Sequence, residues 1–451
     1  MYLAYSLLLT LGTLVLIPHF LFQALAHGKY LSGLRQRLGD LSDLKKLDRP
    51  VIWLHCVSVG ETQAARPLVE RLKKEFPDYS LVVSTITLTG QTLAHDVFAG
   101  KADSVFYFPF DWRWSVRRAV ARVKPSLVLI METELWPNFL KECDAREIPV
   151  ALVNGRISRQ SFRRYSMIRF FLRRVLADLR LAIMQSEVDA SRIIALGMPN
   201  NRVFMAGNLK FDAGSLTPSR EKTEEIAARF DLTSSVPLIL AASTHAQEEK
   251  VMIEAFKQLK EDRAVRLMIA PRHPERFNEV ANLLETSGLK WTRRTQTPSK
   301  EDAQTEVILL DTIGELTATY SLASVCFVGG SIIDRGGHNV LEPASVGTAV
   351  VTGSHTHNFD AIVKLLLEAN GIVQLPPLEP SEAAVPLAHA ISELLNNPDE
   401  RVEMGRRAAD MVASNSGSSE RTIQLISKLL SANQSISSNE NPLAVSNAPV
   451  L

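Results

Sequence analysis

Short apolar runs alternate with amphipathic stretches from residue 51 onward. Such continuous runs, separated by amphipathic helices, are typical of parallel strands covered on both faces of a sheet. The pattern predicts an α/β protein of two Rossmann-like, doubly wound domains. The runs that predict strands are Val51–Leu54, Leu81–Val83, Leu127–Ile130 and Val150–Val153 in the first half, and Pro237–Leu240, Val265–Ile269, Val307–Leu310 and Val325–Val328 in the second.

The domain boundaries follow from length and from two polar stretches. A chain of 451 residues is too long for one hydrophobic core. A polar stretch that carries Pro218 predicts a linker over residues 214–234, between an N-terminal domain at 29–213 and a C-terminal domain at 235–430. Residues 431–451 are rich in Ser, Asn and Ala without periodicity, so we expect a disordered tail.

The first 28 residues differ from the rest of the chain. Residues 2–28 contain no Lys, Arg, Asp or Glu and are long enough to enter or span a bilayer. Pro18 predicts a kinked or tilted helix, and the basic residues Lys29 and Arg35 follow it, which favours the cytoplasmic side for the remaining chain. A cleaved signal peptide is the alternative, but it lacks a basic leading region. We therefore expect residues 1–28 to be a membrane-anchor helix.

Charge and cysteine usage exclude several classes of protein. The formal net charge of +1 gives no reason to expect nucleic-acid binding, so an anionic partner must be met locally. Cys56, Cys143 and Cys326 are the three cysteines, and they form no Cys-x-x-Cys pair. This disfavours a disulfide framework or a zinc site and fits a reducing compartment.

Three predicted strand-to-helix junctions share one pattern, in which a capping residue stands three positions before a glutamate. One interpretation is a capping box that satisfies free N–H groups at a helix start. Because ligands bind at the carboxyl ends of parallel strands, the three together also predict a site in a cleft between the domains. The pairs are Ser58 with Glu61, Thr312 with Glu315, and Asn339 with Glu342.

Glu61 is the candidate general base. It follows Gly60, whose missing side chain lets a substrate approach the turn, and a carboxylate there can take a proton from an attacking hydroxyl. Glu132 and Glu134 also follow a predicted strand and are the alternative carboxylates. Their other interpretation is to orient the loop.

Several features of the second half suit a phosphate or a nucleotide. Arg272, after Pro271, is free to meet a phosphate bidentately, and Gly329 and Gly330 offer backbone N–H groups to an anion. Glu342 is placed to accept hydrogen bonds from ribose hydroxyls. Lys210 lies next to the linker, where it is either a solvated lysine or a group that reaches the cleft.

A stretch between residues 156 and 180 is rich in arginine. Phenylalanines are interleaved with the arginines, and Asp178 is its one acidic residue. A basic helix with aromatic residues suits an anionic lipid surface, whereas a salt-bridged surface face is the plain alternative. The arginines are Arg156, Arg159, Arg163, Arg164, Arg169, Arg173, Arg174 and Arg180.

Three histidines raise the question of a metal. His355 and His357 lack an evident set of carboxylate partners in the sequence, and no Asp-x-Asp pair is present anywhere. We therefore predict catalysis without a metal or other cofactor, and expect His338, His355 and His357 to be loop or phosphate-contact residues.

The chain resembles the 3-deoxy-D-manno-oct-2-ulosonic acid (Kdo) transferases that act on lipid A precursors, inverting glycosyltransferases of the GT-B architecture. The resemblance covers nearly the whole chain except the tail beyond Ser431. Six motifs carry it: Ser-Val-Gly-Glu at 58–61, Met-Glu-Thr-Glu-Leu-Trp-Pro-Asn at 131–138, Asn-Gly-Arg-Ile-Ser at 154–158, Gly-Asn-Leu-Lys at 207–210, Pro-Arg-His-Pro-Glu-Arg at 271–276 and Gly-Gly-His-Asn-Val-Leu-Glu-Pro at 336–343.

The resemblance implies an activity and a location. The donor would be CMP-Kdo and the acceptor a tetra-acylated, bisphosphorylated glucosamine disaccharide, lipid IVA, in lipopolysaccharide biosynthesis. The catalytic domains would face the cytoplasm at the inner membrane, and Glu61 would be the proton acceptor. The positions that would hold the cytidine monophosphate are Pro271, Arg272, Gly314, Glu315, Leu316, Asn339, Val340, Leu341 and Glu342, with Lys210, Gly329 and Gly330 meeting its charge.

Two other classes of function fit parts of the pattern. A sugar-nucleotide epimerase shares the architecture but needs neither an anchor nor a lipid-facing arginine stretch. A non-catalytic lipid-binding protein needs neither Glu61 nor a nucleotide. The transferase accounts for all of these features together.

Overall fold

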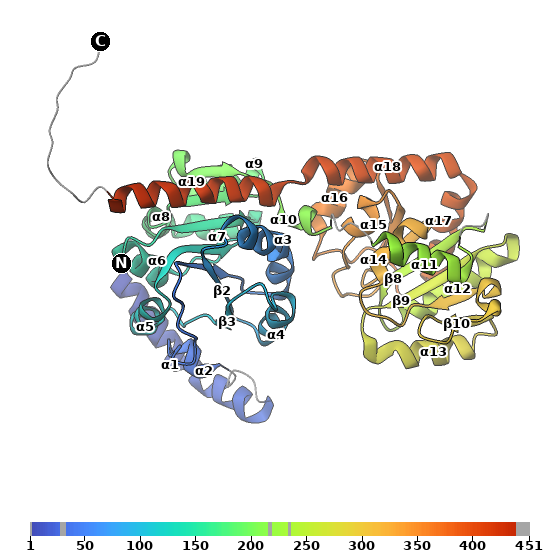
Figure 1. Cartoon of the computed structure of the whole chain (residues 1–451), viewed down its shortest axis with the longest axis horizontal. Helices are drawn as coiled ribbons and strands as arrows, with labels where there is room; N and C mark the ends of the chain where they lie inside the picture. Colours follow the sequence, from blue (N-terminus) through green and yellow to red (C-terminus); the bar gives the residue numbers. More distant parts are fainter. Residues whose placement is uncertain (1, 28–32, 215–218, 233–235, 439–451) are drawn as a thin grey trace, which may run out of the picture. The chain divides into compact units, whose positions relative to one another are not determined.

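The chain folds into two compact units, which are best described separately (Figure 1). The computed structural model describes residues 2–27, 33–214, 219–232 and 236–438. The first unit contains the chain up to Ala213 together with the segment from Gly417, and the second contains Gly214–Ser416. The predicted assignment of residues 417–430 to the C-terminal domain is therefore wrong.

The first unit is built on a seven-stranded parallel sheet in the order β3-β2-β1-β4-β5-β6-β7. Trp53 of β1 aligns with Val82 of β2 and Val128 of β4. The strand order reverses between β1 and β4, which is the switch point where open α/β sheets bind ligands. The strands are β1 Val51–His55, β2 Ser80–Thr85, β3 Ser104–Tyr107, β4 Pro125–Met131, β5 Val150–Gly155, β6 Leu181–Met184 and β7 Val203–Met205.

Helices cover both faces of this sheet, because the strands bury alternate side chains on opposite sides. Trp53 packs in one core with Phe106 and Phe139, whereas Ile52 and Leu54 belong to the other. The helices of the first unit are α1 Tyr2–His27, α2 Leu34–Arg37, α3 Val59–Glu75, α4 Leu88–Val97, α5 Arg113–Val123, α6 Pro137–Ala145, α7 Arg159–Met167, α8 Arg169–Ala177, α9 Glu187–Leu196, η1 Asn200–Arg202, α10 Leu209–Gly214 and α19 Ser418–Ser438.

The second unit repeats the architecture with a parallel sheet in the order β10-β11-β9-β8-β12-β13-β14. Its strand order reverses between β8 and β12, which places a second switch point there. The strands are β8 Leu238–Thr244, β9 Arg266–Pro271, β10 Trp291–Arg293, β11 Val307–Leu309, β12 Val325–Val328, β13 Ala349–Thr352 and β14 Ile372–Gln374.

The helices of the second unit pack their apolar faces on this sheet. Phe256 of α12 and Ile391 of α17 are fully buried in one core with Phe327 of β12. The helices are α11 Arg220–Phe230, α12 Glu248–Asp262, η2 Pro274–Arg276, α13 Phe277–Glu285, η3 Lys300–Gln304, α14 Leu316–Thr319, η4 Tyr320–Leu322, α15 Leu341–Ser345, α16 Asp360–Glu368, α17 Ala384–Asn396 and α18 Pro398–Asn415.

The last helix, α19, belongs to the first unit because its apolar side chains complete a core there. Ile423, Ile426 and Leu430 are buried with Leu68 and Leu72 of α3. The predicted disordered tail is corrected in part, since the helix continues to Ser438. Residues 439–451 lie outside the described residues. The predicted linker also contains structure, because α11 occupies Arg220–Phe230.

Helix α1 is tied to the first unit by its first turns. The hydroxyl of Tyr2 donates a hydrogen bond to Asp178, and that of Tyr5 donates to Asp111 at 3.0 Å. The ring of Tyr5 stacks on Phe171 at a centroid distance of 5.8 Å. Among the described residues, no helix meets the length and hydropathy needed to cross a bilayer.

Candidate active site

Glu61 lies at the switch point of the first sheet, in the first turn of α3 after β1. Ser58 caps this helix, and its hydroxyl donates to the Glu61 carboxylate at 2.9 Å. The other carboxylate oxygen accepts the backbone N–H of Val57 at 2.8 Å. The capping interpretation is therefore correct in part: the glutamate reaches back past the cap to Val57. These two hydrogen bonds and the burial of the side chain, which is only 5% exposed, fix the position of the carboxylate.

The environment of Glu61 moves its titration close to neutral pH. Burial raises the pKa of Glu61 to about 7, and the negative charges of Glu132 and Glu134 add to the rise. The hydrogen bonds from Val57 and Ser58 act in the opposite direction but do not cancel it. A carboxylate with this pKa is matched to general base catalysis at physiological pH.

Lys210 lies within electrostatic reach of the same carboxylates. Burial lowers the pKa of its ammonium group, and Arg156 acts in the same direction, whereas Glu132 and Glu61 oppose the shift. The sequence assigned Lys210 to the donor. The structure places it, within the first unit, where the charges of Glu132 and Glu61 act on it.

The backbone around these charged residues is held in unusual conformations. Glu132 and Asn154 have φ values of 53° and 55°, in the left-handed region that non-glycine residues rarely adopt. Glu132 donates its N–H to Val153 at 2.9 Å, and the side chain of Asn154 accepts the N–H of Leu209 at 3.0 Å. These contacts fix the ends of β4 and β5 and the start of α10, which carries Lys210. Strained positions of this kind cluster at functional sites.

In the second unit, a side-chain hydrogen bond joins the two members of each predicted capping pair. Thr312 donates its hydroxyl to Glu315 at 2.6 Å, and the amide of Asn339 donates to Glu342 at 3.1 Å. The Thr312 hydroxyl lowers the pKa of the Glu315 carboxyl against the effect of burial, and Arg294, which binds Glu315 through two hydrogen bonds of 3.0 Å, lowers it further. The carboxylate of Glu315 is thus held by the protein, and Gly314 precedes it with φ +83°.

Glu342 is anchored from a second side. The hydroxyl of Tyr320 donates to it at 3.0 Å, and Asn339 caps the backbone N–H of Leu341 at 3.1 Å. Burial raises the pKa of Tyr320, and the charge of Glu342 acts in the same direction. A carboxylate held in this way presents a fixed acceptor geometry to a ligand.

The expectation that Gly329 and Gly330 offer free N–H groups to a phosphate is wrong. The N–H of Gly330 donates to the carboxylate of Glu248 at 2.7 Å, and that of Gly329 donates to the carbonyl of Ala242 at 2.9 Å. Glu248 is fully buried and also accepts the N–H groups of Ser331 and Ile332, each at 3.0 Å. The turn is indeed an anion site, but its anion is a side chain of the protein.

Arg272 follows β9 and remains available to a ligand. Its backbone N–H donates to Thr244 at 2.9 Å, which joins the ends of β8 and β9, and its side chain is exposed. Pro271 is buried at the end of the strand. The same edge carries His245 and His338, whose Nε2 atoms are 2.7 Å apart.

The other histidines and the cysteines leave the prediction on metals unchanged. Asp334 lies 3.6 Å from the Nδ1 atoms of both His355 and His357, so these two histidines do have a carboxylate neighbour, contrary to the sequence-based expectation. Within the described ranges, no group of three or more His, Cys, Asp and Glu residues is arranged to hold a metal. All three cysteines are buried and unpaired.

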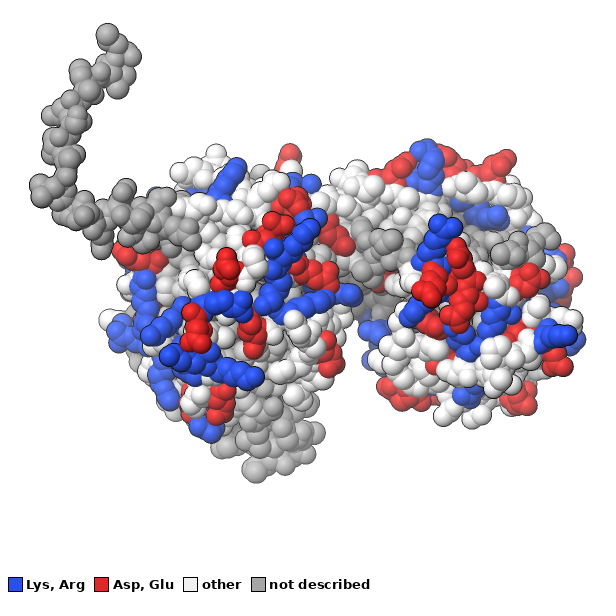
Figure 2. Space-filling model, viewed as in Figure 1, with Lys and Arg blue, Asp and Glu red and all other residues white. Residues whose placement is uncertain are grey.

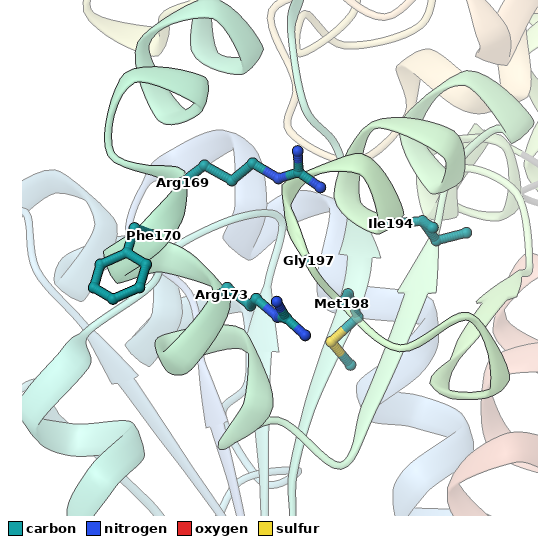
Figure 3. Close-up of a pocket in the computed structure, with 6 residues that line it drawn as sticks. All are labelled: Arg169, Phe170, Arg173, Ile194, Gly197 and Met198. Atoms are coloured by element: carbon teal, nitrogen blue, oxygen red, sulfur yellow. The ribbon is translucent and has the colours of Figure 1, made fainter.

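The arginine-rich stretch forms two helices rather than one. Helices α7 and α8 meet at Met167 and Ile168, which are 83% and 50% exposed. A cavity of about 580 Å³ lies beside α8, and Figure 3 shows Arg169 and Arg173 extending toward Gly197, whereas Phe170 points away. Elsewhere, basic and acidic side chains are interspersed over the visible face of both units (Figure 2).

Comparison with known proteins identifies the family. A family model described as 3-deoxy-D-manno-octulosonic-acid transferase matches residues 32–213. The 3-deoxy-D-manno-octulosonic acid transferase of Haemophilus influenzae is 34% identical over 408 residues, which are 90% of this chain and 93% of that protein. This chain belongs to the Kdo transferase family. It is a glycosyltransferase of lipopolysaccharide biosynthesis.

A second relative supports the same family, and a solved structure supports the fold. The 3-deoxy-D-manno-octulosonic acid transferase of Bordetella pertussis is 32% identical, covering 83% of this chain and 86% of that protein. A crystal structure of UDP-GlcNAc 2-epimerase from Neisseria meningitidis matches with a TM-score of 0.55 over 84% of this chain and 100% of that chain. At 14% identity this likeness shows only the shared GT-B-like fold.

Sequence reasoning missed two residues at the second switch point, His245 and Glu248. They follow β8 with the same three-residue spacing that relates Ser58 to Glu61 after β1. That spacing in the sequence could have identified them as candidate site residues. The sequence could not show that Glu248 binds the Gly329–Gly330 turn, because the two segments are about eighty residues apart in the chain.

Proposed function

We propose that this Kdo transferase transfers Kdo from CMP-Kdo to lipid IVA with inversion at the anomeric carbon, and that Glu61 is the general base. The observation that carries the proposal is the environment of Glu61 at the switch point of the first sheet. It is buried, held by Val57 and Ser58, and has a pKa raised to about 7. Such a group accepts a proton from a hydroxyl at neutral pH.

The reaction then needs one displacement. The acceptor hydroxyl oxygen forms a bond to the anomeric carbon of Kdo while its proton passes to Glu61. The bond from that carbon to the phosphate oxygen breaks, and its electron pair leaves with CMP. Lys210, near Glu61 and Glu132, supplies positive charge beside the reacting groups, and Arg272 supplies it to the leaving phosphate.

On the donor side, the proposed nucleotide contacts lie in the second unit. Pro271 ends β9 and Arg272 follows it, residues 314–316 lead into the first residue of α14, and residues 339–342 span the start of α15. The anchored carboxylate of Glu342 is suited to accept hydrogen bonds from ribose hydroxyls. The fixed geometry of these groups supports the assignment.

We further propose that the catalytic units work at the cytoplasmic face of the inner membrane, where a lipid acceptor is embedded. Helix α1 exposes a row of large apolar side chains while its tyrosines bind the first unit. Met167 and Phe170, exposed beside the arginines of α7 and α8, extend the surface suited to a bilayer interface. The exposed side chains of α1 are Leu3, Leu7, Leu8, Leu11, Leu14, Val15 and Leu16.

The proposal is tested by incubating the full chain with CMP-Kdo and lipid IVA and weighing the lipid by mass spectrometry. We expect mass increments of whole Kdo units, with an anomeric configuration opposite to that of the donor by NMR. The Glu61→Gln variant should give no product while still binding CMP, and Glu70→Gln, on an exposed part of α3, should act as wild type. Product formation by Glu61→Gln near the wild-type rate would remove Glu61 from the role.

A further inference from the structure

His245 and His338 form a pair at the switch point of the second sheet. His245 follows β8 and His338 lies in the segment after β12, and their rings are parallel within 9° with Nε2 atoms 2.7 Å apart. His245 lies between Ser243, near the end of β8, and Gln247, just before α12, whose φ values are 54° and 78°. Left-handed backbone at two non-glycine residues marks this segment as strained, and strained positions cluster at functional sites.

The pair is surrounded by positive charge. Arg272 and His273 influence both rings electrostatically, and Arg335 also acts on His245. In the described part of the chain, the guanidinium groups of Arg272 and Arg335 form neither an ion pair nor a side-chain hydrogen bond. Arg276, by contrast, is already bound to Glu249 at 3.0 Å and to Glu279 at 2.8 Å. Two cations at this edge are therefore available to an anionic ligand.

The hydrogen bond within the pair leaves one donor for a ligand. When both rings are uncharged, one Nε2–H donates to the other Nε2, so the accepting ring carries its proton on Nδ1. Burial lowers the pKa of His245 to about 4 and that of His338 to about 3, which keeps both rings uncharged near pH 7. Among the described residues, no hydrogen bond to either Nδ1 atom is formed.

The loop beneath the pair is rigid. A Cβ atom at Gly330 would lie 2.9 Å from Cδ2 of His338 and 3.6 Å from Cβ of Arg335, so the turn packs closely against both side chains. Glu248 locks this turn through Gly330 and Ser331. His338 and Arg335 are thus preorganised on one turn, without the entropy cost of ordering a flexible loop.

We propose that the His245–His338 pair, with Arg335, binds the carboxylate of the Kdo moiety of the donor, while Arg272 meets the phosphate. This inference rests on the proposed donor, CMP-Kdo. That donor carries two anionic groups, a phosphodiester and a sugar carboxylate, and the switch point offers two unpaired guanidinium groups on two different loops. Since a carboxylate accepts hydrogen bonds at both oxygens, the free Nδ1–H and a guanidinium fork match it.

The test compares two ligands on the full-length protein. Dissociation constants for CMP-Kdo and for CMP are measured by calorimetry, without acceptor, for the wild type and for His245→Asn and His338→Asn. We expect each variant to bind CMP-Kdo about tenfold or more weakly and to bind CMP as the wild type does, since a hydrogen bond to a charged group is removed. The double variant should lose little more than either single variant, because the two rings act as one unit.

Controls separate this role from a structural one. His389→Asn, on the exposed side of α17, should leave both constants unchanged, and His338→Gln gives a second variant with a longer side chain should His338→Asn melt early in a thermal scan. A parallel loss of CMP and CMP-Kdo affinity would assign the pair to the phosphate and overturn the proposal, as would unchanged binding of both. Absence of CMP-Kdo binding by the wild type would instead refute the proposed donor.

Discussion

The carboxylate of Glu248 accepts the backbone N–H of Gly330 at 2.7 Å and so fills the turn after β12. A glycine turn at the end of a parallel strand is a common site for a phosphate. Here the protein supplies the anion itself, and the turn becomes a rigid support for the segment that carries His338. The donor phosphate must then be met by side chains such as Arg272.

Replacing Glu248 tests this support. In Glu248→Gln one oxygen becomes an NH2 group that faces backbone donors, so we expect a loss of about 3 kcal/mol in local stability. Amide hydrogen exchange at residues 330–332 should accelerate by more than tenfold. Glu254→Gln, on the exposed face of the same helix, is the matched control. Equal exchange in both variants would contradict the support role.

The activity should depend on pH through Glu61. The base works in its charged form, and burial raises its pKa to about 7, so transfer should rise with pH and level off above that value. One pH unit below the midpoint the rate should be roughly tenfold under the plateau. Initial rates of kcat/KM between about pH 5.5 and 9 check this. A flat profile across that range would exclude Glu61 as the titrating group.

The hydroxyl of Ser58 tunes that midpoint. It donates to Glu61 at 2.9 Å and lowers the pKa of the carboxyl, so Ser58→Ala should move the midpoint of the rate profile to higher pH. Loss of the helix cap should also cost about 1 kcal/mol of stability. Ser186→Ala removes the equivalent cap of α9, near Asp189, and should lower stability without moving the midpoint. The same shift in both variants would count against a specific effect.

The raised pKa of Glu61 also predicts a stability effect. Between the unfolded value of about 4.5 and the folded value of about 7, the folded state binds more protons, so stability falls as pH rises through this window. Above it the cost is at most about 3 kcal/mol. Glu61→Gln cannot ionise, so its melting temperature relative to wild type should increase by several degrees from about pH 5 to about pH 8. A constant difference would contradict this.

Helix α1 should loosen when its anchor to the first unit is cut. Tyr5 donates to Asp111, whose carboxylate also accepts the N–H groups of Asn138 at 3.0 Å and Phe139 at 2.8 Å. We expect Tyr5→Phe to increase amide exchange in the first turns of α1. Thr10→Val is the control, because Thr10 bonds only to Ser6 within the helix in the described contacts. Unchanged exchange in Tyr5→Phe would contradict the prediction and show that aromatic packing alone holds α1 on the first unit.

The strands show how far a linear pattern reaches. Runs such as Leu127–Ile130 were predicted because a central parallel strand is buried on both faces and reads as continuous apolar sequence. Short edge strands such as β7 and β10 were not predicted. Val203 and Trp291 in these strands are only half-buried, and the strands are too short to give a periodic signal. The segment that forms the C-terminal helix α19 was assigned to the wrong unit, because the apolar face of a helix does not indicate which surface it packs against.

The sequence by itself determined the α/β class of both domains, the family and the three capping pairs, because each strand run, motif and cap is read from residues within a few positions of one another. Only the tertiary structure decided that the charges of Glu132 and Glu61 act on Lys210, that Glu248 occupies the Gly329–Gly330 turn, and that His245 meets His338. Those relations join segments that are distant in the chain. Parallel strand order brings their carboxyl ends to one edge, and burial there sets their charges.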